Sequence, residues 1–220
     1  MDSFIPVLKH TQLFRGLGEG EILALLKCLD AKLRSYGKGE YIFHKGQFVR
    51  DIMVLAEGKL HIQKDDYWGN SNIIQTIAPG EMFGEAYAAP NSGAMLNNVI
   101  AVEESTVIFL DAKGIFTTCS SACAFHSLVV QNLFFALSEK NRRLVQKLGH
   151  MSQRSTREKL MSYLSEESSR QNASTFVIPF NRQQLADFLS VDRSAMSNEL
   201  RKMREDGLIT YEKSRFTLIL

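Results

Sequence analysis

Long apolar runs are absent from this sequence, and cysteine, proline and tryptophan are scarce. No apolar run approaches the roughly 18 residues of a membrane span, and the N-terminal stretch MDSFIPVLKH lacks the cationic and apolar regions of a signal peptide. The 3 cysteines are an odd number, which does not suggest a secreted disulfide framework. We therefore expect a cytoplasmic protein with reduced thiols and no membrane partner.

An excess of either charge is also missing. The 26 Lys and Arg residues against 24 Asp and Glu leave a formal net charge of +2, so any nucleic-acid binding must come from a local arrangement of side chains. The 220 residues can bury a core and hold one large domain or two small ones, and two is our first expectation.

Short apolar alternations separated by glycine fill the stretch from about Lys32 to Asp111, as in DIMVLAEG and NIIQTIAPG. Short strands with turn signals at this spacing predict a compact antiparallel barrel or roll. A helix is predicted before it, in LGEGEILALLKCL, where apolar residues recur at helical spacing. The fold class is therefore α+β, with a sensing domain over residues 1–124.

A long helix is predicted over residues 125–150, where the only glycine, Gly149, stands near the end. Its seam residues alternate steps of four and three, the heptad pattern of a coiled coil: Val130, Phe134, Leu137, Asn141, Leu144 and Leu148. A buried amide such as that of Asn141 can fix register, although a solvated position on a helix packed only in cis fits as well. We expect a homodimer, with Phe135, which is offset from the seam, facing the roll.

The third predicted domain covers residues 151–220. Ser155 and Glu158 have the spacing of a capping box that begins a helix. The polar stretch SEESSRQNAS is expected to end this helix as a loop, and GLITYEKSRFTLIL is expected to form a terminal hairpin.

Two short helices joined by a tight turn are predicted in FNRQQLADFLSVDRSAMSNELRKMREDGLI, with Asn181 and Asp192 as their caps. The second helix has Met196, Leu200 and Met203 on one face. A solvated helix face would explain the opposite, polar face, but a hairpin wing and a dimerising helix favour duplex DNA binding. The candidate DNA-binding residues are Arg182, Gln183, Arg193, Ser194, Ser197, Asn198 and Arg201.

The order of roll, long helix and winged helix-turn-helix resembles the CRP/FNR family of bacterial transcription regulators. RQQLADFLSVDRSAMSNELRKMREDGLI is similar to the DNA-binding signature of that family, and Gly46 and Gly58, 12 residues apart, resemble its cyclic-nucleotide-binding roll. The resemblance implies a palindromic double-stranded promoter site, RNA polymerase as a partner, and base contacts from Arg193, Ser194, Ser197 and Asn198. Because some members have glutamate and arginine where this chain has Ser194 and Asn198, its operator should differ from theirs.

The stretch GEMFGEAY reads as a turn entering a short helix, a geometry that can cradle an anion. It occupies the place of the family's phosphate cassette, with Gly84 and Glu85 matching its first half. The arginine of the cassette falls near Met95 and Leu96, and no Arg or Lys occurs from Ala88 to Ala101. A buried phosphate without a cation beside Glu85 is unfavourable, so we expect an unidentified effector other than cyclic AMP. The resemblance places it between the roll and the helix face carrying Phe135.

Other kinds of sensor need particular side chains to hold a metal or a cofactor. An iron–sulfur cluster is not expected because the N-terminal region offers only Cys28. Haem stays an alternative. The residues that could ligate its iron fall in no specific motif: His44, His61, His126, Cys119 and Cys123. Metal-dependent cupin enzymes need a pair of closely spaced histidines, which His44 and His61 do not form, so no enzyme is expected.

Cys119, Cys123 and His126 are weak candidates for a soft-metal or redox site, because on a helix they would share one face. The alternative is that they are small buried residues at the entry to the long helix, since no fourth ligand is evident. A sensing module with vestigial DNA binding is the corresponding alternative function.

Overall fold

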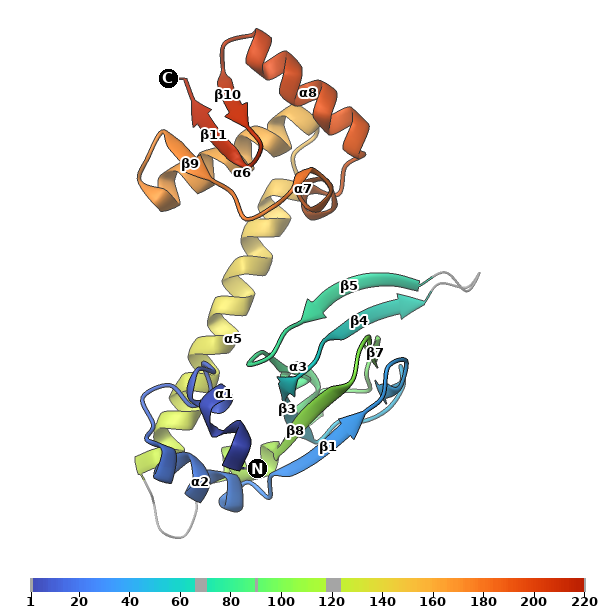
Figure 1. Ribbon diagram of the computed structural model, residues 1–220, viewed down its shortest axis with the longest axis vertical. Coiled ribbons are helices and arrows are strands. Elements are labelled where there is room, and N and C mark those ends of the chain that lie inside the picture. The colour runs from blue at the N-terminus through green and yellow to red at the C-terminus, as the bar shows by residue number, and fades with distance from the viewer. Residues whose placement is uncertain (1, 66–70, 90, 118–123, 220) are drawn as a thin grey trace. The chain divides into compact units, whose positions relative to one another are not determined.

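The computed structural model describes residues 2–65, 71–89, 91–117 and 124–219 (Figure 1). The chain divides into two compact units, Met1–Leu137 and Ser138–Leu220. The division falls inside the long helix α5, Ala124–Met151. The expected domain limits near residues 124 and 150 stay a prediction.

Two four-stranded antiparallel sheets form the predicted roll of the N-terminal unit. The first has the order β1 (Lys32–Tyr36), β8 (Ser105–Asp111), β3 (Asp51–Glu57) and β6 (Met82–Phe83). The second has the order β2 (Tyr41–Phe43), β7 (Asn98–Ala101), β4 (Leu60–Asp65) and β5 (Ser71–Ile77). Both sheets therefore join strands that lie far apart in the sequence.

Strand β3 is buried on both of its faces. Met53 and Leu55 belong to the core inside the roll, whereas Ile52 and Val54 belong to a second core that includes the N-terminal helices. Successive side chains of a strand point to opposite faces, so a continuous apolar run such as DIMVLA suits a strand covered on both sides.

The helices of the N-terminal unit pack on this second core. They are η1 (Asp2–Phe4), α1 (Ile5–Lys9), α2 (Glu19–Cys28), α4 (Ala112–Phe116) and the first half of α5; a further short helix, α3 (Glu85–Ala88), follows β6. On α5 the packed face carries Val129, Leu133 and Ala136. Phe135, which the sequence analysis placed against the roll, is 49% exposed and belongs to neither core of this unit. The core-packed face of α5 is therefore the one with Val129, and the expectation that Phe135 faces the roll stays a prediction.

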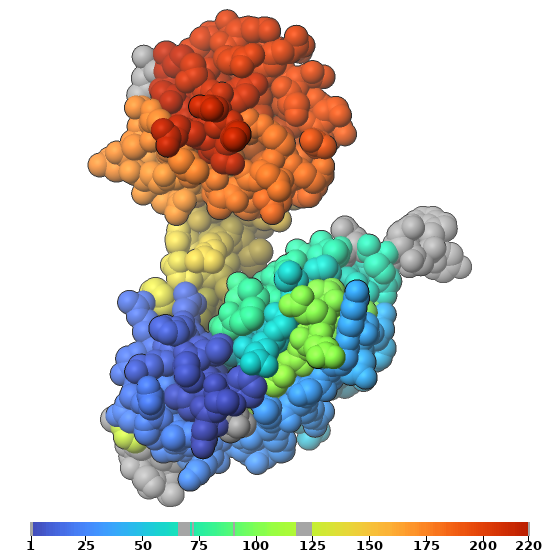
Figure 2. Space-filling model, in the orientation of Figure 1, coloured from blue at the N-terminus to red at the C-terminus, as the bar shows by residue number. Residues whose placement is uncertain are grey.

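In the C-terminal unit, three helices and a three-stranded sheet pack around one core (Figure 1). The helices are α6 (Thr156–Gln171), α7 (Arg182–Leu189) and α8 (Arg193–Glu205), and the sheet has the order β10 (Ile209–Glu212), β11 (Arg215–Leu218) and β9 (Thr175–Val177). Figure 2 shows the chain from α6 onward, coloured orange to red, as one continuous packed body.

Helix α6 is longer than the sequence analysis predicted. The stretch SEESSRQ, expected to be a loop, forms its last turns. Arg170 Nη2 lies 2.6 Å from Glu167 Oε2, and Gln171 Nε2 donates to the same oxygen at 3.1 Å, so polar pairs one turn apart support the helix. Asn172, with φ of 48°, adopts the left-handed conformation that ends it.

Candidate nucleic-acid interface

Side-chain caps begin both helices of the predicted helix-turn-helix. Asn181 Oδ1 accepts from the Gln184 backbone N at 2.9 Å, and Gln184 Oε1 accepts from the Asn181 N at 2.9 Å. Asp192 Oδ1 accepts from the Ala195 N at 2.7 Å. Between the helices Ser190 adopts φ of 51°, which turns the chain sharply after α7. The predicted caps are confirmed, and short-range spacing was enough to find them.

Helix α8 has one buried and one exposed face, as predicted. Met196, Leu200 and Met203 are buried in the core of the unit. Arg193, Ser194, Ser197, Asn198 and Arg201 are all exposed. Ser197 Oγ donates to the Arg193 carbonyl at 2.9 Å, so in the free chain its hydroxyl proton is directed to the helix backbone. The exposed face presents donors and acceptors of the kinds that contact base edges and phosphates.

Arg157 of α6 fixes the position of α8, and the sequence analysis did not identify it. Its Nε lies 2.5 Å from Glu199 Oε1, and its Nη2 lies 2.6 Å from Asp206 Oδ2. The hydrogen bond to Glu199, followed by that to Asp206, raises the pKa of the guanidinium. No local signal could reveal this contact, because Glu199 is 42 residues away in the sequence.

The side chains of Arg182 and Gln183 on α7 contact other residues of the C-terminal unit. The Arg182 guanidinium lies 4.8 Å from the ring centroid of Tyr211 and 5.0 Å from that of Phe216, which attaches α7 to the β10–β11 hairpin. Burial lowers the pKa of Arg182. Gln183 Nε2 donates to Asp187 Oδ1 at 2.8 Å. A role of Arg182 and Gln183 in DNA binding stays a prediction.

The β10–β11 hairpin is the expected terminal wing, and it contributes a residue that the sequence analysis overlooked. Glu212 pairs with Arg215, so Lys213 and Ser214 form a two-residue turn. Lys213 has φ of 50°, in a region where glycine or asparagine is more usual. A lysine at the tip of a wing is a candidate phosphate contact.

The turn before α3 requires glycine because of its backbone conformation. Gly84 has φ of 79°, a left-handed conformation that residues with a Cβ rarely adopt. Met95, near the expected arginine position of the cassette, is 3% exposed and belongs to the roll core, whereas Leu96 is exposed. The left-handed conformation at Gly84 therefore requires glycine whether or not the turn binds an anion.

Only part of the candidate metal-ligand set lies among the residues that the structure describes. Cys119 and Cys123 lie outside the described residues. His126 is buried and donates from Nε2 to the Gly114 carbonyl at 3.1 Å, and the His44 ring stacks on Tyr41 with centroids 4.3 Å apart. Among the residues that the structure describes, no cluster of three or more His, Cys, Asp or Glu side chains could hold a metal ion. No helix in this part of the chain is long and apolar enough to cross a membrane.

The predicted seam of α5 is largely exposed in the single chain. Phe134 is 73% exposed, Leu144 60% and Leu148 62%, with Val130, Leu137 and Asn141 also exposed. Val145, which the heptad pattern did not include, is 60% exposed beside them. An apolar stripe of this kind on a surface helix is typical of a face that another element covers.

A β-roll, a long helix and a winged helix-turn-helix, in this order along the chain, define a class of two-part DNA-binding regulators. Two family models match the chain: a cyclic nucleotide-binding domain over residues 33–121 and a Crp-like helix-turn-helix domain over residues 158–220. The chain belongs to the CRP/FNR family of bacterial transcription regulators.

Individual relatives are distant. The cyclic AMP receptor protein of Thermus thermophilus is 23% identical over 202 residues, which cover 92% of this chain and 89% of the relative. Human cGMP-dependent protein kinase 2 is 30% identical over 103 residues, 46% of this chain but only 13% of the kinase.

Solved structures share the fold. The catabolite activator protein of Thermus thermophilus has a TM-score of 0.51 at 22% identity, covering 95% of this chain and 94% of that one. CprK complexed with OCPA has a TM-score of 0.64 at 13% identity, covering 90% of each chain.

Proposed function

We propose that this regulator works as a homodimer that places α8 of each protomer in successive major grooves of a palindromic promoter site. The observation that carries the proposal is the exposed polar face of α8, held in place by the caps, by Arg157 and by the adjacent wing. The side chains on this face suit base edges near the start of the helix and phosphates further along it. As a promoter-bound regulator in the cytoplasm, it would act on RNA polymerase.

The exposed stripe of α5 supports the dimer. Its members recur at heptad spacing, and pairing with a second copy would bury Phe134, Leu144 and Leu148 together. Asn141 lies within the stripe and would set the register of the pair at some cost in stability. Two α8 helices related by a two-fold axis then match a palindrome.

We infer that the roll responds to an effector other than cyclic nucleotide. Relatives are named for cyclic AMP and cyclic GMP, but in this chain the buried Met95 stands near the expected arginine position, and no Arg or Lys occurs from Ala88 to Ala101. A phosphate in the roll would need a cation to offset its desolvation.

Calorimetric titration tests this inference. Neither cyclic AMP nor cyclic GMP at millimolar concentration should bind saturably or change the affinity for DNA. Saturable binding of either at micromolar concentration would contradict it.

Two arginine variants test the role of α8 in DNA binding. One should reduce sequence specificity, and the other should reduce affinity for every sequence. Arg193→Ala should cost about 1–3 kcal/mol at the cognate site and flatten the preference at one position of each half-site, because a guanidinium can hold guanine O6 and N7 together. Arg201→Ala should weaken binding to cognate and random duplexes alike, and should make the salt dependence shallower by about one unit per lost phosphate contact in each protomer.

Binding isotherms on cognate and scrambled duplexes at two or more salt concentrations separate these outcomes. Equal, sequence-independent losses would mean that Arg193 contacts only the DNA backbone. Base reading would then rest on Ser194, Ser197 and Asn198. No loss for either variant would remove α8 from the interface.

A further inference from the structure

A groove of about 680 Å³ lies within the C-terminal unit, between the last turns of α5, helix α6 and the end of α7. Its wall includes three aromatic rings. The Phe180 and Phe188 centroids are 4.9 Å apart, and the Tyr163 centroid lies 5.4 Å from Phe188 and 6.0 Å from Phe180. A groove of this volume can hold a small molecule, and its rings offer a surface on which a planar ring can stack.

Two cations at the groove form no direct ion pair with a described carboxylate, although the hydrogen bond from Arg142 and, to a smaller extent, the nearby charge of Arg143 lower the pKa of Glu139. Arg142 and Arg170 also line it, but each is paired, with Glu139 at 2.8 Å and with Glu167 at 2.6 Å respectively. Arg143 and Lys147 form no ion pair with any described residue. Lys147 Nζ instead lies 5.3 Å from the Phe188 ring centroid. A positive charge therefore stands directly beside the aromatic wall.

The hydroxyl of Tyr163 is buried without a partner. Tyr163 is 4% exposed, and among the described residues its Oη has no hydrogen-bond partner. Burial, followed by the nearby charge of Glu167, raises the pKa of this hydroxyl, so it stays protonated and able to donate. Leaving a buried hydroxyl unsatisfied costs stability, and a bound molecule with an acceptor would remove that cost.

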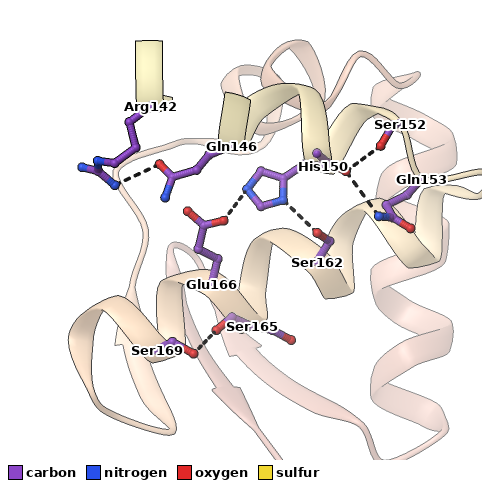
Figure 3. A network of polar contacts seen from close by, with 10 residues as sticks. Arg142, Gln146, His150, Ser152, Gln153, Ser162, Ser165, Glu166 and Ser169 are labelled. Carbon is purple, nitrogen blue, oxygen red and sulfur yellow. Dashed lines mark hydrogen bonds and ion pairs between the residues drawn. The ribbon is translucent and has the colours of Figure 1, made fainter. Parts of the chain in front are cut away.

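The wall between α5 and α6 is held in place by His150 (Figure 3). Its Nε2 lies 3.2 Å from Glu166 Oε2, and its Nδ1 lies 2.9 Å from Ser162 Oγ. A carboxylate can only accept, so Nε2 carries a proton. The buried imidazole thus ties the end of one helix to the middle of the next, and the groove exists before any ligand arrives.

We propose that this groove is a second effector site, separate from the roll, that binds a small aromatic anion. The ring stacks on Phe180 and Phe188, the carboxylate or phosphate pairs with Arg143 and Lys147, and an acceptor on the ring meets Tyr163 Oη. Phe188 belongs to α7, the first helix of the helix-turn-helix, so an occupant contacts the DNA-binding motif directly.

Calorimetry on the full chain tests the site with two anionic probes, 1-naphthoate and AMP, and their neutral counterparts, 1-naphthalenemethanol and adenosine. We expect saturable binding of at least one anion, tighter than that of its neutral counterpart by about tenfold or more. Binding of naphthoate alone or of AMP alone supports the site and assigns the anion as carboxylate or phosphate. Absence of saturable binding of both at millimolar concentration overturns the proposal.

Variants locate the binding. The double variant Arg143→Gln, Lys147→Gln should weaken the anion by about tenfold or more. Arg154→Gln removes an exposed charge of the same unit outside the groove and should have no effect. Undiminished binding by the double variant places the anion elsewhere and overturns the proposal.

Tyr163→Phe supplies a second readout that does not depend on the charges. It should raise the thermal stability of the free protein and weaken the probe that the wild type binds. A stability gain with unchanged probe binding would overturn the role of the hydroxyl in the site.

Discussion

Asp51 faces Asp111 directly across strands β3 and β8. Burial, and after it the negative charge of Asp111, raises the pKa of the Asp51 carboxyl. Because its folded pKa is raised, the folded chain binds this proton more tightly than the unfolded chain. The contribution of Asp51 to stability is therefore fully present below its unfolded pKa of about 3.9 and is lost as the pH rises through the folded pKa.

Asp51→Asn removes a partly buried charge that faces a like charge, and should consequently stabilise the protein at neutral pH by about 0.2–1 kcal/mol, the usual size of one side-chain pair interaction between facing strands. The gain should shrink toward zero as the pH falls below about 4, where both states of the wild type are protonated. Urea unfolding at neutral and acidic pH measures it, with the exposed Glu103→Gln as the control. An equal gain at both pH values, or a loss at neutral pH, would contradict the account.

Single residues were predictable where their partners are close in the sequence. The caps at Asn181 and Asp192 each act within three residues of themselves, so spacing alone revealed them. Arg157 and its carboxylate partners come from distant segments, and only the fold brings them together. The stacking of Arg182 on the wing rings was hidden for the same reason.

Among the elements, the wing presents a conformation that its sequence does not favour. A left-handed φ at a residue with a Cβ costs about 1–2 kcal/mol, and Lys213 adopts it at the turn between β10 and β11. A residue kept in an unfavourable conformation is a candidate for function. We interpret its ammonium as a phosphate contact.

Lys213→Asn should raise the free energy of unfolding by about 1 kcal/mol or less, since asparagine tolerates the left-handed region. It should also weaken DNA binding on all sequences and make the salt dependence shallower by about one unit per protomer. Lys213→Arg should keep the DNA affinity. Chemical denaturation and isotherms at several salt concentrations give both quantities, and unchanged DNA affinity in Lys213→Asn would exclude the phosphate contact.

Periodicity predicted which segments are helices and which are strands. It predicted less well where each helix ends and which of its faces packs against the core. Helix α6 continues beyond the end of its apolar stripe because Glu167 accepts hydrogen bonds from Arg170 and Gln171 one turn further along. Helix α5 has apolar residues on more than one side, so the pattern alone could not tell that Val129, Leu133 and Ala136 pack while Phe135 stays about half exposed.

At the scale of the whole molecule, the order of roll, long helix and winged helix-turn-helix was predictable because each part has its own local signature, and the two family models match the first and last of these parts. The identity of the effector could not be predicted from the sequence, because it depends on side chains that converge from several strands and helices. The burial of Met95 and the left-handed conformation of Gly84 became visible only in the fold.

The central claim, a dimer reading a palindrome through α8, is tested most directly by selecting bound sequences from a pool of random duplexes and sequencing them. The account predicts enrichment of two inverted half-sites whose centres lie one helical turn apart, about 10–10.5 base pairs. Enrichment of a single unrepeated half-site, or of no sequence at all, would contradict it.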